Sequence, residues 1–152
     1  MDLRPAIDAS LKDAMRAKDS ERLSTLRLIN AAIKDREIAA RGDGEEGGVG
    51  DDVVLSILAR MVKQRQESAR AYEEGGRLEL AEKEREEIKV IEEFLPSQLD
   101  EAQTEAAIDA AIERTGATGL RDMGRVMAEL KARHTGQMDF GRVGPTVKDR
   151  LS

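Results

Sequence analysis

Apolar residues in this chain recur at intervals of three or four positions, from the beginning of the sequence to its end. In residues 3–17 the recurring residues are Leu3, Ile7, Leu11 and Met15. In the last segment they are Val143, Val147 and Leu151. This spacing places apolar side chains on one face of an α-helix, whereas a half-buried strand needs alternation at every second residue. The sequence therefore predicts an all-α fold.

The composition agrees with a fold made of packed helices. Aromatic residues make up only 2% of the 152 residues, and there is no Trp. A core must therefore be built from Leu, Ile, Val, Met and Ala. Hydrophobic residues reach 39%, which is too many for a wholly disordered chain. Charged residues reach 37%, against about 25% in a typical soluble domain.

Four helices are predicted in the first 95 residues. The first covers residues 3–17, and the second follows a cap at Asp19 or Ser20 and continues to about residue 41. Residues 42–50 hold five Gly in nine and predict a flexible loop. The third helix is expected to start at the caps Asp51 and Asp52 and to stop at Gly75-Gly76.

The second and fourth helices each have a predicted buried face. In the second helix that face carries Leu23, Leu26, Ile29, Ile33 and Ile38. In the fourth it carries Leu80, Ile88, Ile91 and Leu95. The acidic residues of the fourth helix have the spacing of a solvated face, and they are Glu79, Glu82, Glu86 and Glu93.

Pro96 marks the predicted boundary between two domains, residues 1–95 and 96–152. Proline disfavours helix at the preceding residue, and Phe94 can pack the junction. Three helices are predicted beyond it, of which the first begins at a capping box formed by Asp100 and Gln103. The next is expected to bury Leu120, Met123, Met127 and Leu130. In the last helix Pro145 either shortens the helix or shifts its start, and the sequence leaves both alternatives open.

The residue inventory contains no recognisable catalytic constellation. The absence of Cys excludes thiolate nucleophiles and Cys-ligated zinc, and a single His excludes a multi-histidine metal site. That residue, His134, falls in the last turn of a predicted helix, where a cation complements the helix dipole. No phosphate-binding glycine motif is present. We therefore expect no cofactor, no metal and no catalytic residue.

The sequence also carries expectations about location. It does not open with a basic stretch followed by an apolar one, as a signal peptide does. No apolar run approaches the length of about 18 residues that spans a bilayer. A cytoplasmic location without membrane contact is expected.

Charge is distributed unevenly along a chain of net charge −6. Residues 73–93 carry nine acidic and four basic residues, whereas residues 121–150 carry seven basic and four acidic residues. One interpretation is that these segments neutralise one another by packing side by side. The other is a phosphate-contacting surface formed by the basic residues of the last segment. These are Arg121, Arg125, Lys131, Arg133, Lys148 and Arg150.

Several strings in the sequence resemble the GatB/YqeY family. They are LSTLRLINAAIK at 23–34, KQRQES at 63–68, YEEGGR at 72–77, EEFLPSQL at 92–99, DMGRVM at 122–127 and VKDRL at 147–151. The resemblance covers nearly the whole chain, in order. It implies an all-helical N-terminal part and a small C-terminal part of three helices. It also implies that Gly124 allows a close backbone approach, either to a neighbouring helix or to a phosphate.

The resemblance further implies a link to tRNA-dependent amide formation. The same C-terminal unit forms the tail of the B subunit of aspartyl/glutamyl-tRNA amidotransferase, where it approaches the bent corner of the tRNA. Family members are labelled as carbon–nitrogen ligases with glutamine as the amide donor, but the Ser/Lys amidase machinery of that enzyme is not found in this sequence. The implied partners are tRNA or another structured RNA, and amidotransferase or tRNA synthetase components.

Three hypotheses of function follow. The first is a non-catalytic protein that contacts tRNA through the C-terminal domain. The second is a protein–protein adaptor that uses the acidic fourth helix or the apolar junction at Phe94 and Leu95, with no RNA contact. The third is a carbon–nitrogen ligase in its own right, which the residue inventory disfavours.

Overall fold

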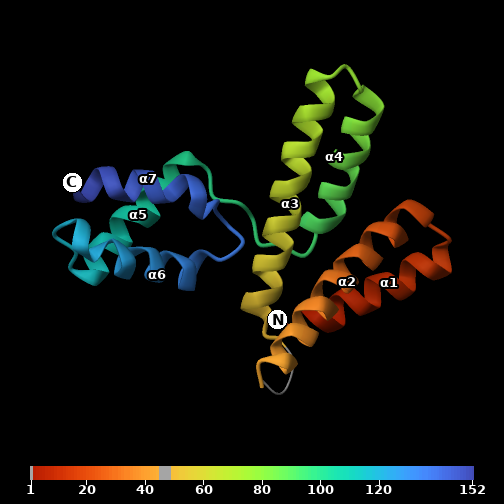
Figure 1. The fold of residues 1–152 in the computed structure, drawn as a ribbon, viewed down its shortest axis with the longest axis horizontal. Helices are drawn as coiled ribbons and strands as arrows, with labels where there is room; N and C mark the ends of the chain where they lie inside the picture. The colour runs from red at the N-terminus through yellow and green to blue at the C-terminus, as the bar shows by residue number, and fades with distance from the viewer. Residues whose placement is uncertain (1, 45–48) are drawn as a thin grey trace. The chain divides into compact units, whose positions relative to one another are not determined.

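The computed structural model describes residues 2–44 and 49–152, and in these ranges the chain forms α-helices and one short 3₁₀ helix but no strand (Figure 1). The all-α prediction is confirmed. The chain divides into two compact units, Met1–Leu95 and Pro96–Ser152, called the N-terminal and the C-terminal unit below. No helix in the described ranges is both long and apolar enough to cross a membrane.

The N-terminal unit consists of two helical hairpins. Helix α1 (Leu3–Ala17) pairs with α2 (Ser20–Gly42), and α3 (Asp51–Glu74) pairs with α4 (Leu78–Glu92), as Figure 1 shows in red to orange and yellow to green. Helix α2 packs against α3 and α4, and α1 touches α3. The large side chains at the centre of this core are fully buried, and they are Ile7, Leu26, Ile29, Ile33, Leu58 and Ile91.

The buried face of α1 differs from the predicted one at its C-terminal end. Met15 is 50% exposed, whereas Ala14 is 2% exposed and belongs to the core. An α-helix turns about 100° per residue, so each four-residue step drifts by about 40°. Three such steps from Leu3 carry Met15 off the face that Leu3 and Ile7 bury. Ala14 follows Ile7 by seven residues and stays on that face.

Two predicted core residues of α2 and α4 also face solvent. Ile38 is 65% exposed, because it lies five residues after the buried Ile33, a rotation of about 140°. Leu80 is 39% exposed, and the neighbouring Ala81 is buried instead. Small side chains at these contacts let helices approach closely, and hydrophobicity alone did not reveal which residue would be used.

Three of the four predicted helix-end signals agree with the structure, namely the cap at Asp19, the stop at Gly75-Gly76 and the capping box at Asp100. The predicted cap at the start of α3 does not. Asp19 caps α2 by accepting a hydrogen bond from the backbone N–H of Arg22 at 3.2 Å. Gly75 caps α3, and Gly76 has a left-handed φ of 75°. The prediction that Asp51 caps α3 is wrong, because Gly50 is the cap and Asp51 instead accepts a hydrogen bond from the backbone N–H of Leu3 at 3.1 Å.

The glycine-rich segment 42–50 is only partly within the described ranges. Gly42 is the last residue of α2, and Gly44 follows in a left-handed conformation with a φ of 84°. Residues 45–48, on which most of the loop prediction rests, lie outside the described residues.

The C-terminal unit contains α5 (Glu101–Thr115), the 3₁₀ helix η1 (Leu120–Asp122), α6 (Met123–His134) and α7 (Phe140–Leu151). The predicted capping box starts α5, with hydrogen bonds in both directions between Asp100 and Gln103. The core residues are Ile108, Ala111, Val126, Leu130, Met138, Val143, Val147 and Leu151. Leu120 was expected in this core but is 48% exposed, because it lies in η1 rather than in α6.

The structure shows how Pro145 and Gly124 fit into their helices. Pro145 lies inside α7, which starts at Phe140 and continues past it to Leu151, so the proline does not end the helix. Gly124 lies near the start of α6, and a Cβ atom placed there would meet no heavy atom within 4 Å. The expected close approach of Gly124 to a neighbouring helix is therefore wrong, since this side of α6 faces open space.

The segment around Pro96 connects the two units along the chain. Its residues make contacts within the unit to which each belongs. Phe94 is 7% exposed and belongs to the N-terminal core. In the C-terminal unit the backbone N–H of Leu99 donates to the carbonyl of Gln137 at 2.9 Å. The Gln98 amide donates to the carbonyl of Gly136, and the Gln137 amide donates to the carbonyl of Ser97 at 3.2 Å. This group of hydrogen bonds, called the loop clamp below, fastens the start of the unit to its α6–α7 loop.

Candidate functional site

The six cations predicted to contact RNA lie on three elements of the C-terminal unit. Arg121 is in η1, three others are in α6, and Lys148 and Arg150 are in the last turns of α7. The three on α6 are Arg125, Lys131 and Arg133. Positions 125 and 131 are about 120° apart around the helix, and positions 131 and 133 about 160° apart. The α6 cations therefore do not form a single stripe.

Three of the six cations are paired with carboxylates. Arg125 donates to Asp122 at 2.6 Å and to the carbonyl of Thr115 at 3.0 Å. Arg133 bonds to Glu129 in the previous turn of α6. Arg150 reaches across to α5, where it pairs with Asp109 and, at 3.7 Å, with Glu105. The charges of these cations are therefore already compensated within the unit.

The other three cations are exposed. Within the described residues Arg121, Lys131 and Lys148 make no ion pair and no side-chain hydrogen bond. Lys148 follows Gly144 by one turn, and Gly144 lies on the side of α7 that faces Met123 at the start of α6. Helix α7, which carries Lys148, also packs against η1, which carries Arg121. Lys131 lies more than two turns further along α6.

Asp122 organises the turn that carries Arg121. Its carboxylate accepts hydrogen bonds from the backbone N–H groups of Thr118 at 2.9 Å and Gly119 at 3.3 Å. These bonds, led by the one from Thr118 and joined by the one from Arg125, lower the pKa of Asp122 to about 2. The sequence analysis missed this residue. A signal was present, since an acid three residues after a glycine break can bond to the free N–H groups there.

Charge is segregated within the C-terminal unit. From Asp100 to Arg114 the chain carries five acidic residues and one basic residue, and this segment contains nearly all of α5. The basic excess lies on α6 and α7. Three ion pairs connect the two sides, two from Arg150 to Glu105 and Asp109 of α5 and one from Arg114 to Glu129 at 3.8 Å. The unit is thus acidic on one element and basic on two others.

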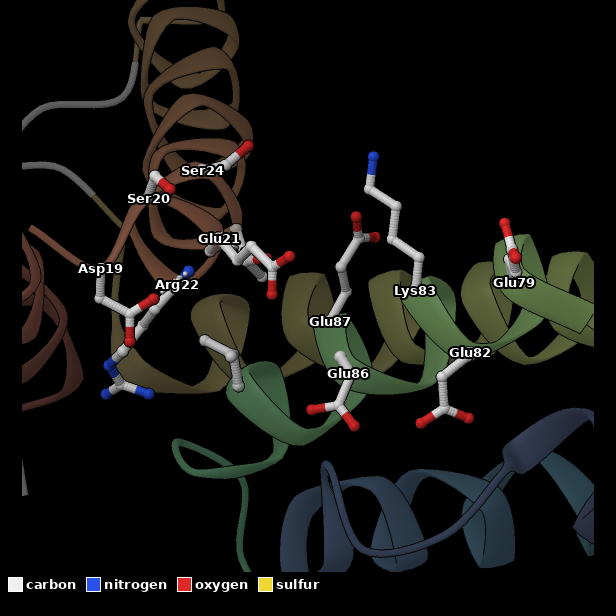
Figure 2. A pocket seen from close by; sticks show the side chains of 12 residues that line it. Asp19, Ser20, Glu21, Arg22, Ser24, Glu79, Glu82, Lys83, Glu86 and Glu87 are labelled. Carbon is white, nitrogen blue, oxygen red and sulfur yellow. Dashed lines mark hydrogen bonds between the residues drawn. The ribbon is translucent and has the colours of Figure 1, made fainter.

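The N-terminal unit has a pocket of about 630 Å³ between the start of α2 and the face of α4 (Figure 2). Its charged lining consists of two cations, Arg22 and Lys83, and six carboxylates. The carboxylates are those of Asp19, Glu21, Glu79, Glu82, Glu86 and Glu87. In Figure 2 Glu82 and Glu86 point away from Lys83 and Glu87, so the acids flank α4 on more than one side. Such a lining repels phosphates and other anions.

The pocket does not have the arrangement of a hydrolytic site. Thr25 is 3% exposed, and its hydroxyl donates to the carbonyl of Glu21 at 3.3 Å rather than to a base. Within the described residues no hydrogen bond joins a pocket hydroxyl to Lys83, the base that a Ser–Lys pair would need. No group of three or more His, Asp or Glu in the described ranges is placed to hold a metal ion.

Two carboxylates of α4 have shifted pKa values with opposite signs. Lys89 donates to Glu86 at 3.0 Å, and this hydrogen bond lowers the pKa of Glu86. Burial, with the neighbouring charge of Glu87, raises the pKa of Glu84. Glu87 itself is held by Arg65 of α3 at 2.9 Å. Lys89 thus favours the ionised form of Glu86, whereas burial disfavours the ionised form of Glu84.

Comparison with curated proteins finds relatives in fungi. The protein "Altered inheritance of mitochondria protein 41, mitochondrial" of Lachancea thermotolerans is 37% identical over 103 residues, which are 67% of this chain and 51% of the relative. The protein of the same name from Clavispora lusitaniae is 36% identical over 96 residues, covering 62% and 52%. That from Kluyveromyces lactis is 34% identical over 89 residues, covering 59% and 46%. The chain thus spans about half the length of these relatives.

These names correct one expectation. The relatives are named mitochondrial proteins, so the prediction of a cytoplasmic location is wrong. That prediction rested on the lack of a signal peptide and of an apolar run long enough to cross a bilayer. Neither feature distinguishes the cytoplasm from a mitochondrial compartment.

The family match covers more of this chain than any of the three matches to relatives described above. The sequence fits the family described as "Yqey-like protein" from residue 4 to residue 151. That range includes all seven α-helices and η1, and it extends across the boundary at Pro96. The strings that suggested the resemblance fall on α2, α3, α4, α6, α7 and the segment around Pro96. The chain belongs to the Yqey-like protein family.

Proposed function

We propose that this chain is a non-catalytic helical protein that contacts tRNA through its C-terminal unit, in association with tRNA-dependent amide formation. The observation that carries the proposal is the set of three exposed cations that the fold leaves without a carboxylate. These are Arg121, Lys131 and Lys148, within a segment that has seven basic and four acidic residues.

Cations without a carboxylate partner gain the most binding free energy from contact with a polyanion such as RNA. A phosphate that binds Arg121 or Lys148 releases a condensed counterion from the RNA and breaks no ion pair in the protein. A phosphate that binds Arg125 or Arg150 must instead compete with Asp122 or Asp109. The proposal therefore assigns most of the binding to three of the six predicted cations. The resemblance to the tail of the amidotransferase B subunit supports tRNA as the ligand.

The contact is expected to recognise the RNA backbone and its shape rather than unpaired bases. Stacking on unpaired bases requires exposed aromatic side chains, and the C-terminal unit has only Phe140, which packs against its core. Three phosphate contacts give a slope of log K against log salt of roughly −2 to −3. Affinity on the order of micromolar is expected near physiological salt.

A tRNA titration with the full chain at two salt concentrations tests the proposal. The variant Lys131→Glu/Lys148→Glu is expected to weaken binding at least tenfold and to reduce the salt slope by about 2. The matched control is Arg125→Glu/Arg133→Glu, which makes the same change in net charge at cations that are already paired. Its effect should be clearly smaller.

Two results would contradict the proposal. One is the absence of tRNA binding at low salt, and the other is equal loss in both double variants, which would show only a response to net charge. The first result would favour an adaptor without RNA contact, and the second would replace the three-cation site with binding by net charge alone. Such an adaptor would have to use the acidic face of α4, because Phe94 at the apolar junction is buried in the N-terminal core.

A further inference from the structure

Helix α2 carries a stripe of cations on a face that does not contribute to the core. Arg27, Lys34 and Arg41 are each seven residues apart, and all three are exposed. Ala31 and Ile38 lie between them, so the stripe has the alternating spacing of four and three residues that helices use to pack on one another. Seven residues of helix rise about 10.5 Å, so the three cations span about 21 Å.

Among the described residues of the N-terminal unit, none forms an ion pair with these cations. Other arginines of this unit bridge helices, since Arg4 pairs with Glu37, Arg22 with Glu93 and Arg65 with Glu87. Within the described residues the three stripe cations make no ion pair and no side-chain hydrogen bond. Ile38, in the middle of the stripe, is 65% exposed. The face thus combines positive charge with an uncovered apolar side chain.

Helix α4 carries a stripe with the same spacing and the opposite charge. Glu79, Glu86 and Glu93 are also seven residues apart and exposed, with Glu82 and Lys89 between them. These five residues lie opposite the side of α4 that buries Ala81, Ile88 and Ile91. The acidic stripe spans about 21 Å, as the basic one does.

We propose that the basic stripe of α2 binds the acidic stripe of α4 of a second copy of this chain. Equal seven-residue spacing lets three cations face three carboxylates along two packed helices. A helix also covers Ile38, which a phosphate backbone leaves in water. This exposed apolar residue favours a helical partner over a nucleic acid.

The pairing requires a second copy because α2 and α4 of one chain contact each other mainly through core residues such as Leu26, Ile29 and Ile91, and only Glu93 of the acidic stripe reaches α2 of its own chain. Within the unit, Arg22 in the first turn of α2 bonds to Glu93 at the end of α4. In addition, Glu86 is already bonded to Lys89. The new ion pairs therefore replace some existing ones at an exposed surface, and the association is weak and sensitive to salt.

Charge-reversal variants of the full chain test the pairing by sedimentation velocity at low and high salt. The wild-type chain is expected to form dimers or longer assemblies at low salt and to dissociate at high salt. Two variants, Arg27→Glu/Lys34→Glu and Glu79→Lys/Glu86→Lys, are each expected to stay monomeric. Mixing them should restore association, because each reversed stripe then faces a partner of opposite charge. Circular dichroism establishes that both variants remain helical.

The control is Lys12→Glu/Lys18→Glu, which changes net charge equally on the exposed side of α1 and should associate as the wild type does. A wild-type chain that is monomeric at low salt would overturn the proposal, as would a mixture that stays monomeric. If Arg27→Glu/Lys34→Glu loses tRNA binding while its assembly state equals that of the wild type, the stripe is a nucleic-acid contact and the proposal is also wrong.

Discussion

The two units of this protein bury their cores by different means. In the N-terminal unit two long helices, α2 with 23 residues and α3 with 24, bring large aliphatic side chains to zero or nearly zero exposure. In the C-terminal unit the helices have 15, 12 and 12 residues, and fewer large side chains are fully buried, namely Ile108, Val126, Leu130 and Val147. Small units have less interior to bury, so each contact contributes a larger share of their stability.

The two units also differ in their polar interactions. The N-terminal unit uses ion pairs that connect helices already joined by apolar contacts, such as the pair from Arg65 to Glu87. The C-terminal unit also has ion pairs that connect helices, such as that from Arg150 to Asp109, and adds hydrogen bonds that fix its loops, namely the capping box at Asp100, the carboxylate of Asp122 and the loop clamp. The comparison indicates that loop geometry stabilises the smaller unit to a degree that the larger unit does not need.

The largest effects are expected from removing one matched core side chain in each unit. Leu58 and Leu130 are 0% and 1% exposed, so Leu58→Ala and Leu130→Ala remove the same buried atoms. Each substitution should cost about 3 kcal/mol. Hydrogen exchange read by mass spectrometry should show reduced protection only in the unit that carries the change, and more severely in the C-terminal unit. Loss of protection in both units from either variant would show that they unfold together.

A smaller effect is expected from opening the loop clamp. Gln98→Ala removes the hydrogen bond from the Gln98 amide to the carbonyl of Gly136 and leaves that carbonyl without this donor. The expected cost is about 1 kcal/mol in the C-terminal unit, measured as a lower midpoint in urea. The matched control is Gln64→Ala on the exposed side of α3, which should change the midpoint by much less. Equal shifts of the urea midpoint in the two variants would contradict a stabilising role of the loop clamp.

The smallest effect concerns the titration of Asp122. Its pKa of about 2 lies below the value of about 3.9 for an unfolded chain, so the ionised form favours the folded state. That contribution is present above pH 4 and is lost as the pH falls towards 2. Carboxyl NMR should record a pKa of about 2 in the wild type and a higher value in Arg125→Ala. Arg121→Ala should leave the pKa unchanged, because the Arg121 side chain makes no hydrogen bond or ion pair with the Asp122 carboxylate.

How much of the fold could be predicted depended on whether a feature was local. The capping box at Asp100 and Gln103, the cap at Asp19 and the stop at Gly75 could all be read from the sequence, because each depends on a few neighbouring residues. The apolar stripe of α7 was also predicted correctly, since Val143, Val147 and Leu151 cover only two turns and drift little.

Errors arose where several residues competed for one contact. Met15, Ile38, Leu80 and Leu120 are all apolar, and all four are at least 39% exposed. Ala14, Ala40 and Ala81 are buried in the first three of these helices instead. Hydrophobicity alone does not encode the distance between two helices, and only packing sets it.

In the candidate site, too, some features could be predicted from the sequence and others depended on packing. The sequence by itself determined an all-helical family member with a basic segment at 121–150, because composition, periodicity and charge are properties of the chain. Only the tertiary structure decided which cations are available, because pairing depends on which carboxylate comes within reach. Arg150 is compensated by α5, about forty residues earlier in the chain, whereas Lys131 is not. Free charge at a surface is therefore a result of packing, which brings together residues distant in sequence.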